Sequence, residues 1–128
     1  MKKILFVLAL ISVCFVSCKK NKEKAIIGKW QIVMNITQYQ GGSDSLDVRK
    51  ANDFTTFRED KTFYITNGKE DKNFNYFIRE NTLYYFTLGG MDTNRMEIIM
   101  LNSKKLSLKM SLPNFENTTM ILNYERVD

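Results

Sequence analysis

The sequence predicts an all-β domain, folded as an up-and-down antiparallel barrel of about eight strands. Along residues 26–128, apolar and polar residues alternate in short stretches that are rich in Thr, Tyr, Phe and Ile, a pattern typical of half-buried strands. Only a few turn residues separate one stretch from the next, so neighbouring strands run antiparallel. A barrel removes every exposed sheet edge, and a two-sheet sandwich is the alternative.

The first strand is predicted at residues 29–39, where every second residue is apolar and must face a core. Residues 40–53 break this alternation with glycines and charges. We expect the longest loop of the domain there, with room for a turn of helix. Its residues 41–53 are the candidate lid over the open end of the barrel, and Arg49 and Lys50 are candidates for meeting an acidic head group.

Seven further strands are predicted after this loop. They cover residues 54–58, 62–66, 73–79, 82–88, 95–101, 106–111 and 118–127. The dipeptide Asn67-Gly68 gives a strong hairpin signal because both residues tolerate positive φ. Glu80-Asn81 and Gly89-Gly90 mark two further turns. Because the connections are short, each strand is expected to lie beside its predecessor.

The first eighteen residues resemble the signal of a bacterial lipoprotein. Lys2 and Lys3 precede an apolar run that is too short to span a bilayer. The run ends in Phe15-Val16-Ser17-Cys18, which resembles the lipobox that lipoprotein signal peptidase recognises. Cleavage before Cys18 makes this cysteine the lipidated N-terminus. An ordinary secreted protein or a retained membrane anchor is the alternative.

These features divide the chain into three expected segments. Residues 1–17 are the signal peptide, residues 18–25 a lipidated basic tether and residues 26–128 the barrel domain. A lipid on Cys18 places the protein on the bacterial outer membrane. The residues that follow Cys18 are basic, whereas the motif that sorts some lipoproteins to the cell surface is acidic. We therefore expect an anchor that faces the periplasm.

The distribution of charge argues against nucleic acid as a partner. The chain has a formal net charge of +5, but residues 25–128 contain 13 basic and 13 acidic residues and are neutral. A neutral domain lacks the basic patch that a nucleic-acid-binding protein needs. The basic tether, in contrast, can lie against anionic lipid head groups.

The missing residue types exclude several kinds of chemistry. The sequence contains no histidine, and its two cysteines are Cys14 and Cys18. Nucleophiles paired with histidine, disulfides within the domain, and metal sites of thiolate or imidazole are therefore excluded. The acidic pairs Glu59-Asp60 and Glu70-Asp71 lie on predicted turns, where they are explained as turn formers. We expect no enzyme activity, no metal and no cofactor.

Two short motifs at the ends of the domain resemble the lipocalin signature. Gly28-Lys29-Trp30 opens the first strand, and Arg126 lies at the end of the last one. In lipocalins the tryptophan of Gly-x-Trp plugs the closed end of the barrel, and an arginine of the final strand packs across its ring. The resemblance implies that Gly28, Trp30 and Arg126 close the barrel and form no active site. The chain is shorter than typical secreted lipocalins and more closely resembles the small lipocalin-like domains found in lipoproteins of Gram-negative bacteria.

The alternation also predicts which side chains fill the barrel. The inward set is Trp30, Ile32, Met34, Ile36, Phe63, Ile65, Phe74, Tyr76, Ile78, Tyr84, Phe86, Met96, Ile98, Met100, Leu106, Leu108, Met110, Met120, Leu122 and Tyr124. The candidate ligand-binding residues within it are Met34, Tyr76, Tyr84, Phe86, Met100 and Met110. Methionines adapt to apolar ligands, and tyrosine hydroxyls can meet a polar head. The alternative is a filled core with a shallow cup.

The opposite strand faces predict an outward apolar stripe. Its members are Phe77, Leu83, Tyr85, Ile99 and Leu101. Such a stripe marks a protein partner, a dimer contact or a membrane surface, unless a bulge turns part of it inward. We therefore expect non-catalytic binding of a small hydrophobic or amphiphilic molecule inside the barrel. The alternative is a protein-interaction or inhibitor lipoprotein that acts through its outer surface.

Overall fold

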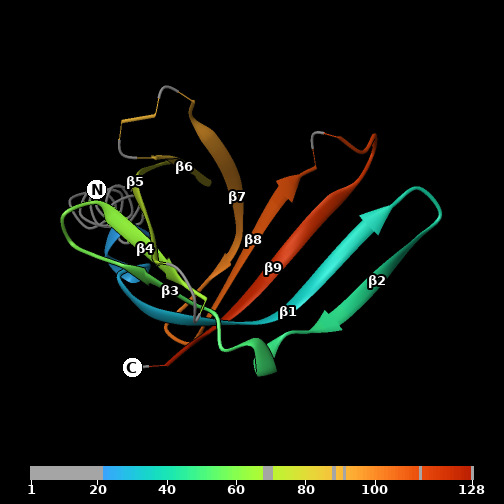
Figure 1. Cartoon of the computed structure of the whole chain (residues 1–128), viewed down its shortest axis with the longest axis horizontal. Helices are drawn as coiled ribbons and strands as arrows, with labels where there is room; N and C mark the ends of the chain where they lie inside the picture. The colour runs from blue at the N-terminus through green and yellow to red at the C-terminus, as the bar shows by residue number, and fades with distance from the viewer. Residues whose placement is uncertain (1–21, 68–70, 88, 91, 113, 128) are drawn as a thin grey trace, which may run out of the picture.

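The computed structural model describes residues 22–67, 71–87, 89–90, 92–112 and 114–127. The strands in this part of the chain are β1 (Gly28–Tyr39), β2 (Gly42–Asp47), β3 (Phe54–Phe57), β4 (Thr62–Thr66), β5 (Asp71–Arg79), β6 (Thr82–Thr87), β7 (Asn94–Leu101), β8 (Lys105–Ser111) and β9 (Thr119–Arg126). They form one antiparallel sheet, and β1 pairs with β9 so that the sheet closes into a barrel (Figure 1). The predicted all-β antiparallel barrel is confirmed, with strands in all eight predicted ranges.

The described residues contain two short helical segments. A single turn at residues 22–25 precedes β1, and a 3-10 helix, η1 (Arg49–Ala51), follows β2. Among the described residues, no helix has the length and apolar character needed to cross a bilayer. The expected signal peptide and Cys18 lie outside the described residues.

The prediction of an unbroken loop at residues 40–53 is wrong at residues 42–47, which form strand β2. β2 pairs with the second half of β1, from Met34 to Tyr39, and β3 pairs with its first half, from Gly28 to Gln31. β2 and β3 therefore follow one another along the same edge of β1, separated by η1. β3 also pairs with β4, whereas the described pairing of β2 is with β1 alone. The expected helical turn is present as η1, but residues 42–47 of the expected lid form a strand that extends the β1 hairpin, with every side chain exposed.

Arg49 and Lys50 lie on the outer surface in η1. The guanidinium of Arg49 lies 3.3 Å from the carboxylate of Asp47 and 3.3 Å from that of Glu125, while Lys50 is exposed. Both ion pairs of Arg49 are exposed to water, so they contribute little to stability. The expectation that these two residues meet a head group over the barrel mouth finds no support in this geometry.

A β-bulge in β1 reverses the faces that simple alternation predicts. The pairing of β1 with β9 shifts by one residue between Ile32 and Met34, and Val33 is the extra residue. A bulge of this kind re-aims every side chain that follows it. Asn35 then pairs with the inward Leu122. Met34 and Ile36 consequently lie on the outer face, and the inward orientation predicted for both is wrong.

A second bulge does the same in β7. Its pairing with β8 shifts between Ile98 and Met100, which leaves Ile99 as the extra residue. Ile98 is buried in the core, whereas Met100 is 47% exposed. Leu101 packs against the core from inside. The predicted inward Met100 and outward Leu101 are therefore exchanged.

The faces of β6 are also opposite to those predicted. Leu83 is fully buried and Tyr85 packs against the core, although both were expected outside. Tyr84 instead stacks on Phe77 across the outer face, with ring centroids 4.9 Å apart and planes at 15°. Phe86 shares the face of Tyr84 because it lies two residues further along the strand. Alternation could not choose the face here, because both faces of β6 carry large apolar side chains.

The closed end of the barrel is built around Trp30, which has no exposed surface. Its indole Nε1 donates a hydrogen bond of 2.8 Å to the carbonyl of Ile26. Gly28 begins β1 at a φ of 139°, which favours glycine over any residue with a Cβ. The turn before β1 is thereby folded under the barrel and covers the indole.

Arg126 completes this closure from the last strand. Its guanidinium carbon lies 4.2 Å from the centre of the Trp30 ring, the stacking that the parity of β9 predicts. The same group donates hydrogen bonds to the carbonyls of Ile27 at 2.8 Å and Ala25 at 2.6 Å, and its Nε donates to Ser103 at 2.8 Å. One side chain thus ties the segment before β1 to the β7–β8 turn.

Side chains fill the interior of the barrel next to this closed end. The buried cluster consists of Ile26, Trp30, Phe57, Phe63, Tyr76, Leu83, Met96, Ile98, Leu106, Leu108 and Tyr124. Phe57 packs on Phe63 at 5.0 Å and edge-on to Tyr76 at 5.2 Å between ring centroids. The described residues therefore contain a closed sheet with its own core.

The two most buried tyrosines predict loss of stability at high pH. Burial raises the pKa of Tyr124 to about 12, and burial also raises that of Tyr76 to about 12. The tyrosines of the unfolded chain ionise near pH 10, so the contribution of Tyr76 and Tyr124 to the free energy of unfolding is present below that pH and is lost between pH 10 and 12. We expect a loss of about 2 kcal/mol from Tyr124 alone over this interval. Urea unfolding at several alkaline pH values measures the decrease.

Tyr124→Phe is the control for this prediction. In Tyr124→Phe, the part of the decrease in stability that comes from Tyr124 must disappear. Titration of the tyrosines by absorbance must then show one high-pKa group fewer than in the wild type. An identical pH dependence in the wild type and in Tyr124→Phe would contradict the assignment.

Candidate functional site

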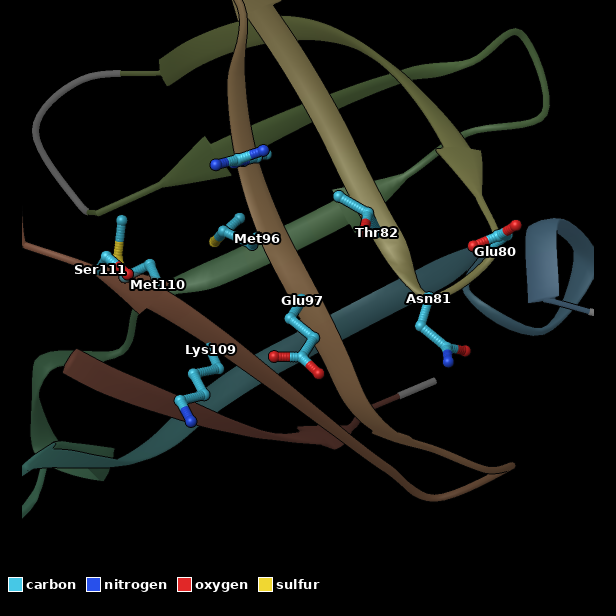
Figure 2. A pocket seen from close by; sticks show the side chains of 9 residues that line it. Glu80, Asn81, Thr82, Met96, Glu97, Lys109, Met110 and Ser111 are labelled. Atoms are coloured by element: carbon cyan, nitrogen blue, oxygen red, sulfur yellow. The ribbon is translucent and has the colours of Figure 1, made fainter.

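An opening in the barrel wall lies between β7 and β8. Their pairing extends from Leu101 and Leu106 to Glu97 and Lys109. Beyond that point the two strands separate, and the described ladder does not continue to Ser111. The separation leaves a cavity of about 450 Å³, which is within the roughly 300–1,000 Å³ of small-molecule pockets. Figure 2 shows the strands converging on their turn and parting on the opposite side.

The inner side of this opening is apolar. Met96 is buried and belongs to the core cluster, and it pairs in register with Leu83. Met110 is partly buried, packs against the same cluster and pairs with Met120. Both methionines line the cavity (Figure 2). The opening therefore reaches from solvent to the side chains of the core.

The outer rim of the opening is charged and polar. Arg95, Glu97 and Lys109 come from the outer faces of the two strands, and Glu80 belongs to the turn before β6. The remaining polar lining residues are Asn81, Thr82 and Ser111. The rim thus offers two cations and two carboxylates around an apolar floor. Both charges of a zwitterionic group can find a partner there.

The turn at Glu80 and Asn81, which borders the opening, is held by the N-terminal segment. Lys22 Nζ donates a hydrogen bond of 3.2 Å to the carbonyl of Glu80 and a second one to the side-chain oxygen of Asn81. The amide of Ile98 donates to the carbonyl of Asn81 at 2.7 Å. The position of this border therefore depends on contacts from two other parts of the chain.

The structure disperses the residues that the sequence proposed for ligand binding. Met110 lines the wall opening. Tyr76 is in the core near the closed end, where its hydroxyl donates to the carbonyl of Arg58 at 3.3 Å. Met34 and Met100 lie together on the outer face, lining a different groove, and the outer face of β6 carries the remaining two candidates, Tyr84 and Phe86.

The rim residues Arg95, Glu97 and Lys109 were not predicted. In the sequence they are ordinary charged residues at outward positions of strands, where such residues usually meet only water. Their relevance comes from the divergence of β7 and β8, which no local pattern signals. Met96 was predicted to face inward, and its burial in the core confirms this.

The described residues give no sign of a metal site. No group of three or more His, Cys, Asp or Glu side chains within metal-binding distance occurs in the part of the chain that the structure describes. The chemistry that the opening offers is hydrogen bonding, ion pairing and apolar contact.

A closed eight-stranded barrel with an opening to its core belongs to the class of small β-barrel binding folds. A family model described as a lipocalin-like domain matches residues 26–108. The chain therefore belongs to the lipocalin-like domain family. None of the curated protein sequences matches it significantly.

Two solved structures from Bacteroides share the fold. A lipocalin-like protein from Bacteroides uniformis is 19% identical, with 80% of this chain and 99% of that chain covered and a TM-score of 0.54. An uncharacterized protein from Bacteroides eggerthii is 16% identical over the same shares of the two chains, also with a TM-score of 0.54. At these identities the likeness concerns the fold alone.

Proposed function

We propose that the protein binds a small amphiphilic molecule at the opening between β7 and β8 and catalyses no reaction. The observation that supports this proposal is the composition of the opening, with Met96 and Met110 of the barrel interior inside and a charged rim outside. The lipocalin-like fold is compatible with such a role. Neither methionine belongs to the closed end of the barrel, which is built around Trp30 and Arg126.

The filled core limits how the ligand can sit. Leu83, Ile98 and Leu108 are buried below the opening, so an apolar chain cannot extend far toward the closed end without displacing them. We expect the apolar part to contact the two methionines, whose thioether side chains adapt their shape at low cost. The polar part then lies at the rim between Arg95 and Glu97.

Native mass spectrometry and calorimetry test this proposal on residues 22–128, which contain the closed sheet and its core. Dodecylphosphocholine, dodecanoate and dodecylammonium, all below their micelle concentrations, share one chain and differ in head-group charge. Because the rim carries both signs, we expect the zwitterionic probe to bind tightest, in a one-to-one complex. Met110→Trp fills the opening and is expected to weaken binding at least about ten-fold, equivalent to about 1.4 kcal/mol.

Met100→Trp is the matched control, because the same substitution is made on the outer face, away from this opening. Its affinity for the probe must equal that of the wild type. Absence of a one-to-one complex with all three probes would overturn the proposal, and so would an equal loss of affinity in the two variants.

We further propose that the barrel is a lipoprotein of the outer membrane that faces the periplasm. The lipobox-like sequence ending at Cys18 supports this placement, and only residues 19–21 separate Cys18 from the turn under the barrel. In bacterial cells fed radiolabelled palmitate, we expect the wild type to incorporate the label and Cys18→Ala to lose it and leave the membrane fraction. Label in Cys18→Ala, or none in the wild type, would contradict the anchor.

A further inference from the structure

The two β-bulges turn their methionines toward the same place on the outer face. Met34 pairs with Asn123, Asn123 with Ser107, and Ser107 with Met100. These four residues form one row across β1, β9, β8 and β7. Without the bulges, alternation would direct both methionines into the barrel. Bulges re-aim side chains at functional positions, and here two of them act on one row.

A groove of about 230 Å³ follows this row. Ser107 is only 6% exposed, although it lies on the outer face. Its hydroxyl donates a hydrogen bond of 2.5 Å to the side-chain oxygen of Asn123. The amide nitrogen of Asn123 has no hydrogen-bond partner among the described residues. The groove therefore has a polar floor with free N–H donors between two apolar walls.

The surroundings of the groove have the composition of a protein interface. Ile99 is 45% exposed beside Met100, which is 47% exposed. The adjacent row consists of Lys105 and Glu125, which pair across β8 and β9 and both line the groove. An apolar centre with a polar, charged rim is the usual anatomy of protein interfaces.

The outer face of β1, β9, β8 and β7 around this groove is self-complementary in its apolar and charged residues. We propose that this face binds a second copy of the chain. A two-fold axis that runs between β8 and β9, parallel to the strands, places Lys105 opposite Glu125 of the second copy. It also places Met34 opposite Met100 of the second copy, and Ser107 opposite its Asn123. Each contact occurs twice, as an isologous interface requires. The wall opening keeps its own lining in such a dimer, so this inference does not depend on the proposed function.

Sedimentation velocity of residues 22–128 over a range of concentrations tests the dimer. We expect a concentration-dependent dimer that Met100→Glu weakens at least about ten-fold. Leu46→Glu and Phe115→Glu are matched controls, because both residues are exposed apolar side chains outside this face, and neither is expected to change the equilibrium. Thermal unfolding must show that Met100→Glu is folded, as its exposure predicts.

Charge-reversal variants test the proposed contact between Lys105 of one copy and Glu125 of the other. Lys105→Glu and Glu125→Lys each place like charges opposite one another in a dimer of identical chains, so each variant alone is expected to be monomeric. Mixing the two restores opposite charges between chains, and a heterodimer is expected. A monomer at all concentrations, a dimer that Met100→Glu leaves unchanged, or no heterodimer on mixing would each overturn the proposal. A complex only with other proteins would also overturn it.

Discussion

Replacing Trp30 with alanine is expected to lower the free energy of unfolding by about 3–5 kcal/mol, the usual cost of truncating a buried aromatic side chain. Trp30 has no exposed surface and lies at the centre of the closed end. The substitution opens a cavity against the core and removes the ring on which Arg126 stacks. It also leaves the carbonyl of Ile26 without its indole donor. Urea unfolding at neutral pH measures the loss.

Two further variants separate these contributions. Trp30→Phe keeps an aromatic face for Arg126 and lacks the N–H donor, so it is expected to lose clearly less than Trp30→Ala. Arg126→Ala leaves the indole in place and removes donors to three carbonyls, for an expected loss of about 2 kcal/mol. Unchanged stability in Trp30→Ala would show that the closed end is not built around this residue.

The contact between Trp30 and Arg126 also predicts how the variants combine. Residues in direct contact give double-mutant losses that differ from the sum of the single losses. The double variant Trp30→Ala and Arg126→Ala is therefore expected to lose less than the two single variants together, because the second substitution removes a partner that is already gone. Strict additivity would mean that the stacking contributes nothing to stability.

The positions of the strands were predictable because they depend on local chemistry. Alternation of polar and apolar residues and short polar turns such as Glu80-Asn81 mark where a strand begins and ends. Residues 42–47 escaped detection because every side chain of β2 is exposed, so no apolar alternation marks the strand. Its pairing with β1 depends on backbone hydrogen bonds, which the sequence does not display.

The faces of the strands were less predictable than their positions. A bulge shifts the parity of all later residues, and the sequences around Val33 and Ile99 contain no glycine or proline that would announce one. Both bulges became visible only through the register against the neighbouring strand. The candidate residues Met34 and Met100 were therefore assigned to the wrong side of the barrel.

The wall opening depends on tertiary structure still more strongly. Met110 was predicted as a ligand-binding residue because it is a flexible apolar side chain on an inward position, and it does line the opening. Arg95 and Lys109 join it only because β7 and β8 stop pairing beyond Glu97. The separation of two strands is a property of the whole sheet, so the sequence of either strand alone does not predict it.

Leu83→Ala is expected to lower the free energy of unfolding by about 2–5 kcal/mol, as for a leucine truncated in a core. Leu83 is fully buried and pairs with Ile78 and Met96 from the two neighbouring strands. The surrounding barrel is closed, so it can collapse only partly around the missing side chain. Urea unfolding again measures the loss.

Tyr84→Ala is the matched control for this prediction, because it removes the larger side chain from the next position of the same strand. It loses the stacking on Phe77 at the outer face, and aromatic pairs contribute about 0.5–1.5 kcal/mol beyond the area they bury. Truncating Leu83, the smaller residue, is thus expected to lower the free energy of unfolding more than truncating Tyr84, the larger one. The reverse order would mean that β6 presents the opposite face to the core, as alternation alone suggested, and would exchange the inner and outer surfaces of this strand.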